Sequence, residues 1–302
     1  MRFATYTHRN ITQSGAVVED VVVPLNRLVD RYGLASIDPK QPVLLDMLLA
    51  DSAAWEAASA ISDTDLHDLA TVDSTPLADV RLKPPIQHPS KFIGVGLNYH
   101  DHAREAQADL PTIPMLFAKF SNCLVGNGEP IVVPSLTTKP DYEGELAFVM
   151  GKRARNVDRG SALQYVAGYT IVNDVSARDY QKATSQFTAG KMFDTFAPCG
   201  PWLTTSSEVP HPDRLSLRTV VNGELRQDSN TSQLIFDIPH LIEFISSFAT
   251  LEPGDIIATG TPGGVGGRMD PPVWLKSGDV VRIEIEGLGV LENPVVSSQE
   301  ST

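Results

Sequence analysis

Residues 141–150 read Asp-Tyr-Glu-Gly-Glu-Leu-Ala-Phe-Val-Met, and this stretch predicts more about the fold than any other. The alternation from Tyr142 to Met150 predicts a β-strand, whose period of two places Glu143 and Glu145 on one face. Two adjacent carboxylates repel each other and are costly to remove from water, so burial of both requires a cation between them. The alternative is a solvated strand face on which both side chains point to water. The spacing alone does not choose between these two interpretations.

A third carboxylate follows at the end of another apolar strand, which reads Tyr-Thr-Ile-Val-Asn-Asp at residues 169–174. A side chain at the end of a strand, such as that of Asp174, is well placed to enter a cleft. Three carboxylates without His or Cys suit Mg²⁺, Mn²⁺ or Ca²⁺ better than Zn²⁺. Glu143, Glu145 and Asp174 are therefore the candidate metal ligands.

Composition limits the classes of function. The 302 residues carry a formal net charge of −13 and no basic run, which argues against a nucleic-acid partner because phosphate binding needs clustered Lys and Arg. No stretch approaches the roughly 18 apolar residues that span a bilayer, and the N-terminus lacks the apolar core of a signal peptide. Cys123 and Cys199 alone make neither a disulfide framework nor a cysteine metal site. We expect a cytoplasmic protein without membrane or nucleic-acid partners.

The chain is expected to divide into unequal parts. Residues 2–25 are typical of short strands, and apolar residues recur at helical spacing between Val43 and Leu69. The prolines of residues 76–90 cannot sustain a helix or a central strand, so a linker is expected there; a long surface loop within one domain is the alternative. The predicted parts are a small N-terminal α/β domain at 1–75, a proline-rich linker at 76–90, a catalytic domain at 91–296 and a disordered tail at 297–302.

Beyond the linker, short strands alternate with Gly and Pro turns, which predicts a β-rich α+β fold. Asn222-Gly223 follows an apolar strand at 216–221 and predicts a tight hairpin. Residues 238–248 carry their apolar side chains along one helical face. A further helix is expected to start near Ser176, where Ser-Ala-Arg-Asp resembles a capping box.

Other polar residues are candidates for chemistry, each with a simpler structural alternative. His102 and Glu105 lie at i and i+3 if this segment is a short helix, so the carboxylate could orient an imidazole that acts as a general base or acid. A solvated polar helix is the alternative. Lys191 lies in a largely apolar stretch and could bind an anionic substrate near a divalent metal. The alternative is a surface lysine.

The glycine-rich segment at residues 259–267 follows a strand. It lacks the Gly-Lys-Ser/Thr of a phosphate-binding loop, and no helical pattern follows it, so it does not match a nucleotide site. It predicts either a nest of backbone N–H groups that meets a carboxylate with help from Thr261, or a flexible loop.

The order of these elements along the chain resembles the fumarylacetoacetate hydrolase superfamily, most closely the group with a small N-terminal domain. The resemblance is strong over residues 91–296 and weak before them. The motifs that carry it are Gly-x-Gly-x-Asn-Tyr-x-x-His-x-x-Glu at 94–105, Phe-x-Lys-Phe at 117–120, Glu-x-Glu at 143–145, Asn-Asp-x-Ser-Ala-Arg-Asp at 173–179, Gly-Lys-x-Phe-Asp-Thr at 190–195 and Thr-Gly-Thr-Pro-x-Gly-Val-Gly at 259–266.

The resemblance implies a catalytic domain with a mixed β-roll, a homodimer, and a Mg²⁺ or Mn²⁺ ion, for which Ca²⁺ could substitute, held by the three carboxylates. It also implies that His102 and Glu105 form a water-activating dyad and that Lys191 helps to bind substrate or stabilise an enolate. Leu97 departs from relatives that hydrolyse acylpyruvates, which can carry arginine there. The implied substrate-binding residues are Tyr99, Lys119, Arg178, Gln181, Gly260 and Thr261.

The implied chemistry starts from a 2-oxo acid whose carboxylate and keto oxygens chelate the metal, which then stabilises an enolate. With an activated water, a 1,3-dicarbonyl acid such as fumarylacetoacetate or an acylpyruvate is hydrolysed at a C–C bond, and this is the reaction expected first. Without that water, the same enolate serves oxaloacetate decarboxylation, tautomerisation, or isomerisation of a 2-hydroxyhepta-2,4-diene-1,7-dioate. A non-catalytic structural protein is a further alternative, which loss of a ligand or of the dyad would favour.

Overall fold

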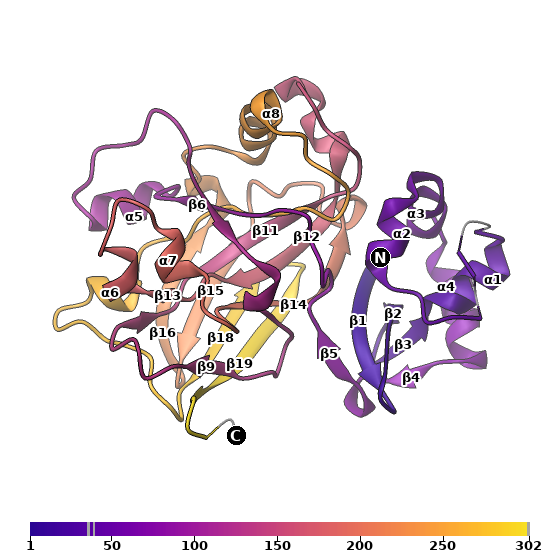
Figure 1. Ribbon diagram of the computed structural model, residues 1–302. Coiled ribbons are helices and arrows are strands. Elements are labelled where there is room, and N and C mark those ends of the chain that lie inside the picture. Colours follow the sequence, from indigo (N-terminus) through magenta and orange to yellow (C-terminus); the bar gives the residue numbers. More distant parts are fainter. Residues whose placement is uncertain (35–36, 39, 301–302) are drawn as a thin grey trace.

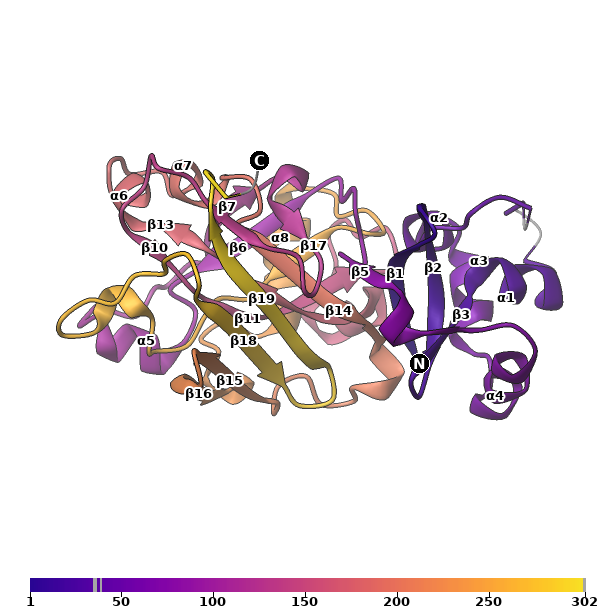
Figure 2. The ribbon, with the colours of Figure 1, turned by 90° about the horizontal axis from the view of Figure 1, so that it is seen from below.

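The computed structural model describes residues 1–34, 37–38 and 40–300. Its centre is a twelve-stranded sheet in the order β4-β3-β2-β1-β14-β12-β11-β17-β6-β7, with β5 added at β1 and β8 at β14. A five-stranded sheet, β16-β15-β18-β19-β9, packs on it through β15, β18 and β19 (Figure 2). The N-terminal elements lie together at one end of the molecule (Figure 1).

The N-terminal part combines strands of the large sheet with four helices. Its elements are β1 (Arg2–His8), β2 (Ile11–Val18), β3 (Val21–Pro24), α1 (Leu25–Tyr32), α2 (Leu45–Ala50), α3 (Ser52–Ser59), α4 (Asp63–Val72), β4 (Thr75–Pro76), the 3-10 turn Leu77–Asp79 and β5 (Arg81–Lys83).

The remainder of the chain supplies the other strands and four further helices. The strands are β6 (Phe92–Gly96), β7 (Met115–Lys119), β8 (Leu124–Val125), β9 (Ile131–Val133), β10 (Pro140–Asp141), β11 (Gly144–Met150), β12 (Val166–Asn173), β13 (Ser176–Ala177), β14 (Ala197–Thr205), β15 (Ser216–Val221), β16 (Glu224–Asn230), β17 (Ile256–Ala258), β18 (Val280–Ile285) and β19 (Gly289–Ser297). The helices are α5 (His100–Glu105), α6 (Arg178–Gln181), α7 (Thr188–Lys191) and α8 (Ile238–Phe248). Short 3-10 turns occupy Ser121–Cys123, Arg159–Tyr165, Ser206–Glu208, Thr231–Gln233 and Gly266–Arg268.

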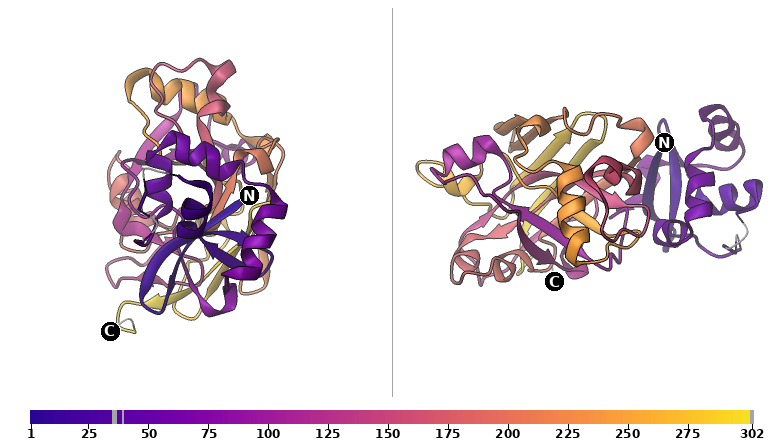
Figure 3. Two further views of the ribbon diagram at one scale, coloured as in Figure 1. Left: turned by 90° about the vertical axis from the view of Figure 1, so that its right-hand side faces the viewer. Right: turned by 90° about the horizontal axis from the view of Figure 1, so that it is seen from above.

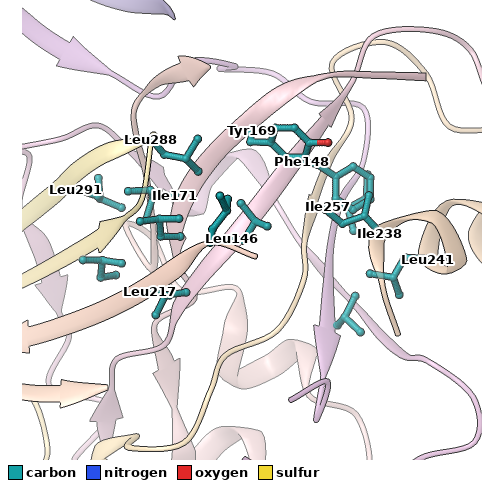
Figure 4. Packing of buried hydrophobic residues seen from close by; sticks show 14 of the residues in the cluster. Leu146, Phe148, Tyr169, Ile171, Leu217, Ile238, Leu241, Ile257, Leu288 and Leu291 are labelled. Carbon is teal, nitrogen blue, oxygen red and sulfur yellow. The ribbon is translucent and has the colours of Figure 1, made fainter. Parts of the chain in front are cut away.

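Successive side chains of β11 enter two different cores, because a strand points its residues alternately to opposite faces. Leu146 and Phe148 belong to the cluster that includes Leu241 of α8 (Figure 4). Ala147 and Val149 belong to the cluster that includes α2 and α3 of the N-terminal part. The orange helix α8 covers the first face (Figure 3, right), and the N-terminal part continues the second core. Strand β11, which contains Glu145 and directly follows Glu143, is therefore buried on both faces.

Two local expectations are confirmed. Helix α8 spans the residues expected, with the side chain of Asp237 accepting the N–H of His240 at its N-terminus. The hairpin between β15 and β16 turns at Asn222 and Gly223, whose φ angles of 53° and 80° match the primed turn that Asn-Gly favours.

The capping-box expectation at Ser176 is wrong. Ser176 lies in β13, which pairs with β10, and α6 begins two residues later at Arg178. The Ser176 hydroxyl donates to the carbonyl of Asp174 instead of capping the helix. Local side-chain to backbone bonds of this kind compete with capping.

The segments expected as linker and tail carry structure of their own. Within residues 76–90, β5 pairs with β1 in an antiparallel ladder, and β1 in turn pairs with β14. At the C-terminal end, β19 runs to Ser297, and Ser298 donates its N–H to the carbonyl of Val133. Residues 301–302 of the expected tail lie outside the described residues, and Glu300 donates its N–H to the carbonyl of Ser297. The domain boundary at residues 76–90 stays a prediction.

Within the described ranges of the chain, no helix has both the length and the apolar character required to span a bilayer.

The central strand provides the first testable prediction. Leu146 is fully buried in the core (0% exposed), so Leu146→Ala removes apolar contacts and leaves a cavity. We expect the free energy of unfolding to fall by about 2–5 kcal/mol in urea titrations followed by circular dichroism. Leu225→Ala, at a position 53% exposed, is the matched control and should stay within about 0.5 kcal/mol of the parent. Equal losses in the two variants would contradict this account of the core.

Candidate metal centre and active site

Three carboxylates form a buried cluster at the ends of the two central strands. One ligand oxygen from each of Glu143, Glu145 and Asp174 lies within 4.8 Å of the others. Their residues are 6%, 1% and 0% exposed, which excludes the solvated strand face considered from the sequence. The fold brings together the three residues that the sequence nominated as metal ligands.

The pairing of β11 with β12 explains this convergence. The strands are antiparallel with Gly144 opposite Asn173, so the start of one strand meets the end of the other. Glu143 lies just before β11 rather than inside it, where the side chain of Asn173 accepts its N–H. The N–H of Asp174 in turn donates to the carbonyl of Glu143 at 2.9 Å. These cross-strand bonds fix the two acidic segments side by side.

Basic side chains neutralise part of the negative charge. The Lys191 ammonium lies 2.6 Å from Glu143 Oε2 and 2.6 Å from Asp174 Oδ2. Arg178 Nη1 lies 2.7 Å from Glu143 Oε1, and Lys119 lies 2.6 Å from Asp174 Oδ1. In the described part of the chain, no such ion pair reaches Glu145, which accepts the Gly260 N–H at 2.8 Å.

The pKa shifts follow from this unequal neutralisation. Burial favours the neutral form of Glu143, but Lys191 and Arg178 outweigh it and lower its pKa to about 2. Burial, together with the neighbouring charges of Asp174 and Glu143, raises the pKa of Glu145 well above its ordinary value. Burial opposes the charge of Lys191, yet Asp174 and Glu143 raise the pKa of this lysine overall. Glu145 is thus the carboxylate whose ionisation the chain does not compensate, and without a metal it favours its neutral form.

Lys119 is a buried residue that contacts the carboxylate cluster through Asp174. Its ammonium donates to Asp174 and to the carbonyls of Lys191 and Phe196, and the residue is 2% exposed. An ammonium has three N–H donors, so all of them are used within the protein. Lys119 therefore differs from the substrate-facing residue that the resemblance implied, because it holds α7 against the metal ligands instead.

The predicted dyad is assembled on α5. His102 Nδ1 lies 3.2 Å from Glu105 Oε2, as i and i+3 positions on a helix allow. Burial opposes ionisation of Glu105, but the bonds from His102 and from the Gly264 N–H lower its pKa overall. The fully buried Asn98 anchors the start of this segment by donating to the carbonyl of Thr259 at 2.8 Å.

The glycine-rich loop is a nest for carboxylates of the chain itself. Gly264 has a φ of +98°, and a Cβ there would lie 2.0 Å from the carbonyl oxygen of Arg226, so this turn requires glycine. The N–H of Gly260, expected near a substrate, is used by Glu145. The other loop N–H donors contact the carboxylates of three acidic side chains: Gly263 with Asp101 at 3.3 Å, Gly264 with Glu105 at 3.0 Å, and Gly266 and Gly267 with Asp141 at 2.8 and 2.9 Å.

A cavity of about 250 Å³ is lined both by His102 of the dyad and by Glu143 and Glu145 of the carboxylate cluster, a size that suits a small ligand. Figure 1 shows the elements that surround it, α5, α6 and α7, on the side opposite the N-terminal part. The nominated residues that line the cavity are His102, Glu143, Glu145, Arg178, Gln181, Lys191 and Thr261. The other nominated residues, Tyr99, Glu105, Lys119, Asp174 and Gly260, are not among its lining residues, and Tyr99 is fully buried.

Three residues of the site were missed from the sequence. Asp141 accepts Arg178 Nε at 2.8 Å as well as the loop N–H groups, so it positions both. Lys182 and Arg268 line the cavity directly. Asp141 is the first residue of the stretch 141–150, but its hydrogen-bond partners Arg178, Gly266 and Gly267 are distant in the sequence. Lys182 and Arg268 are exposed basic residues of ordinary type and carry no local signal.

The residues present fit a divalent cation. Oxygen-only donors, complete burial and a carboxylate without its own cation match the preference of Mg²⁺, Mn²⁺ and Ca²⁺ for hard anionic ligands. The Lys191 ammonium already lies between Glu143 and Asp174, so the space between these carboxylates accepts a cation. The cluster can therefore bind a metal.

Comparison with known proteins agrees with the site. The family model described as fumarylacetoacetate (FAA) hydrolase C-terminal matches residues 91–296. The chain belongs to the fumarylacetoacetate hydrolase family, as the motifs indicated, and is an enzyme of that family. The expected β-rich α+β fold of this family is confirmed.

Similar proteins carry different activities in their names. The chain is 43% identical over 266 residues to a mitochondrial oxaloacetate tautomerase of Xenopus laevis, covering 87% of this chain and 82% of that protein. A 2-hydroxyhepta-2,4-diene-1,7-dioate isomerase from Mycobacterium marinum is 35% identical, with a TM-score of 0.73 and 99% of both chains covered. A maleylpyruvate hydrolase from Sphingobium sp. SYK-6, solved with manganese(II) and pyruvate, is 31% identical, with a TM-score of 0.77 over 98% of this chain and 99% of that one.

The raised pKa of Glu145 leads to a prediction about the stability of the metal-free protein. Because its pKa is raised on folding, the folded state keeps this proton at a pH where the unfolded chain has lost it. The metal-free fold therefore loses stability as the pH rises above the ordinary glutamate pKa. Glu145→Gln, which carries no charge, should raise the Tm of the chelator-treated protein at pH 7 and abolish the further rise on adding Mg²⁺ or Mn²⁺.

Differential scanning calorimetry with chelator and with metal measures both effects. Glu19→Gln, at a side chain that is 82% exposed, is the control and should leave both Tm values unchanged. A lower Tm for metal-free Glu145→Gln, or a preserved response to metal, would contradict the assignment.

Proposed function

We propose that this enzyme catalyses the keto–enol tautomerisation of a four-carbon 2-oxo diacid, oxaloacetate, with Mg²⁺ or Mn²⁺ as cofactor. The carrying observation is that His102, which contacts Glu105, lines the same cavity as the carboxylates Glu143 and Glu145. This arrangement supplies a proton carrier beside a cation site. The identity of 43% to an oxaloacetate tautomerase over 87% of the chain supports this reaction among those open to the family. The order expected from the sequence, with hydrolysis first, is thereby reversed.

The chemistry requires one proton to leave C3 and one to reach the oxygen on C2, with no water consumed. A divalent cation held by Glu143, Glu145 and Asp174 would supply Lewis-acid stabilisation of negative charge on the 2-oxo group. His102 accepts and returns the proton, and Glu105 holds the imidazole in its orientation. The proton that leaves carbon is thus kept beside the substrate until oxygen receives it.

Binding of the acid is assigned to the wall next to the metal ligands. Arg178 is held by Asp141 and Glu143, and its Nη1 also donates to Gln181 Oε1 at 2.9 Å, so the guanidinium and amide are fixed in one orientation. Lys191 can interact with the developing negative charge when a divalent cation takes over its partners. A preorganised wall of this kind reduces the entropy lost on binding.

Hydrolysis of a C–C bond in a 1,3-dicarbonyl acid is the second candidate. The same dyad could activate a water, and the similarity to the maleylpyruvate hydrolase over 98% of the chain supports this reading. The two reactions differ in one observable respect, because only hydrolysis incorporates water into products.

The test is to follow both reactions with the metal-loaded protein. Enol-oxaloacetate decay at 260–280 nm is compared with the uncatalysed rate, and products from oxaloacetate, an acylpyruvate and maleylpyruvate are identified by NMR. We expect accelerated tautomerisation without loss of carbon skeleton. Cleavage of the dicarbonyl acids with no acceleration of tautomerisation would establish the hydrolase instead.

The dyad carries its own prediction. His102→Ala removes the proton carrier, so turnover should fall about 10²–10⁴-fold, while the Tm increase caused by metal is retained because His102 is not a proposed metal ligand. Glu105→Gln should show a smaller loss, since the imidazole remains. Normal turnover of His102→Ala would show that another group moves the proton.

Three further expectations stay predictions: the choice between Mg²⁺ and Mn²⁺, the homodimer and the cytoplasmic location. The manganese(II) ion in the structure of the maleylpyruvate hydrolase supports Mg²⁺ or Mn²⁺ as the metal of this protein.

The homodimer is supported by an exposed edge of the large sheet. Strand β7 is the last strand of that sheet, and Met115 on it and Phe120 directly after it are 41% and 45% exposed. An exposed apolar edge of this kind favours a partner. Sedimentation velocity distinguishes monomer from dimer.

A further inference from the structure

The cavity has basic residues on one side that serve no role in holding the metal. Lys182 follows α6 directly, and Arg268 ends the 3-10 turn Gly266–Arg268 of the glycine-rich loop. Both line the cavity beside Arg178, although the chain as a whole carries a net charge of −13. A local excess of positive charge on an acidic protein needs a physical reason.

These basic groups are not neutralised by the chain. Within the described residues, neither Lys182 nor Arg268 forms an ion pair or side-chain hydrogen bond with an acidic group. Arg268 interacts electrostatically with Glu105, but the two oxygens of Glu105 already contact His102 and the N–H of Gly264. Burial and the neighbouring charges of Arg268 and Arg178 lower the pKa of Lys182, as repulsion between cations requires.

A second observation points to a ligand at this place. Arg178 is only 9% exposed, and its Nη2 has no hydrogen-bond partner although Nε and Nη1 are fully used. A buried N–H donor without a partner costs free energy, so it is normally satisfied by water or by a ligand. Arg178 lines the same cavity as Lys182 and Arg268.

Other residues that line the cavity are apolar: Val95, Leu97, Met115, Phe117 and Phe187. Negative charge on a bound molecule is therefore stabilised near the metal site and near Lys182 and Arg268, but not against these apolar side chains. A ligand with one carboxylate, bound at the metal site, would leave Lys182 and Arg268 unneutralised.

We propose that Lys182 and Arg268, together with the free Nη2 of Arg178, bind the second carboxylate of a 2-oxo diacid and so select diacids over monoacids. This rests on the proposed function in so far as the first carboxylate and the 2-oxo group occupy the metal end. Lys182 and Arg268 are then specificity-determining residues, and the diacid is held between the two ends of one cavity.

The test compares two stable ligands that differ only in this group. 2-Oxoglutarate and 2-oxopentanoate have the same chain length, but the second has a methyl group where the first has its distal carboxylate. Their Kd values are measured by calorimetry with the full-length protein loaded with Mn²⁺. The parent should bind 2-oxoglutarate at least 10-fold more tightly, since charge-assisted hydrogen bonds are the stronger class.

Lys182→Gln/Arg268→Gln should weaken 2-oxoglutarate binding about 10-fold and leave 2-oxopentanoate binding unchanged. Lys182→Arg/Arg268→Lys keeps both charges and should retain most of the preference. Lys152→Gln/Arg153→Gln removes two exposed charges that do not line this cavity, and should change neither Kd.

An unchanged preference in Lys182→Gln/Arg268→Gln, equal weakening of both ligands, or no preference in the parent would overturn the subsite. Because binding is measured without turnover, its result is separate from the tautomerase assay. If the parent prefers 2-oxoglutarate, Lys182→Gln/Arg268→Gln loses that preference, and the parent does not accelerate tautomerisation, the subsite stands and the proposed reaction is rejected.

Discussion

Repulsion among three buried carboxylates is the constraint on which the rest of the site depends. Glu143, Glu145 and Asp174 each bring one oxygen within 4.8 Å of the others in a buried region. Basic residues from β7, α6 and α7 contact two of these carboxylates, yet among the described residues Glu145 receives only a backbone N–H. The fold therefore compensates part of the charge and leaves a remainder that suits a divalent cation. This remainder is a stability cost that a purely structural cluster would have no reason to keep.

The glycine-rich loop couples the parts of the site. Its N–H groups contact Glu145, a candidate metal ligand, Glu105 of the candidate dyad, and Asp141, which orients Arg178. The loop approaches these carboxylates closely because glycines such as Gly264 permit backbone conformations and distances that a Cβ forbids. Movement of this loop would change the metal ligand and the dyad together, so preorganisation of the site rests on it.

The sequence predicted those features that depend on neighbours along the chain. Glu143 and Glu145, the strand-end Asp174, the i and i+3 dyad and the Asn222 hairpin all follow from local spacing. The features that it did not predict depend on distant partners: Lys119 meets Asp174 and Phe196 across 55 and 77 residues. Ser176 failed as a cap because its hydroxyl found the carbonyl of Asp174. Spacing along one segment carries no information about such contacts.

The carboxylate cluster and the His102–Glu105 pair differ in their exposure to solvent. The metal ligands have at most 6% exposure, where low polarity strengthens the interaction of a cation with developing negative charge. The side chains of His102 and Glu105 are 14% and 27% exposed, so the proton carrier remains within reach of solvent. A buried base would hold one proton and exchange it slowly, whereas a partly exposed one can recover its charge state between turnovers. The arrangement therefore separates the buried site for charge stabilisation from the partly exposed site for proton exchange, whichever of the reactions considered is catalysed.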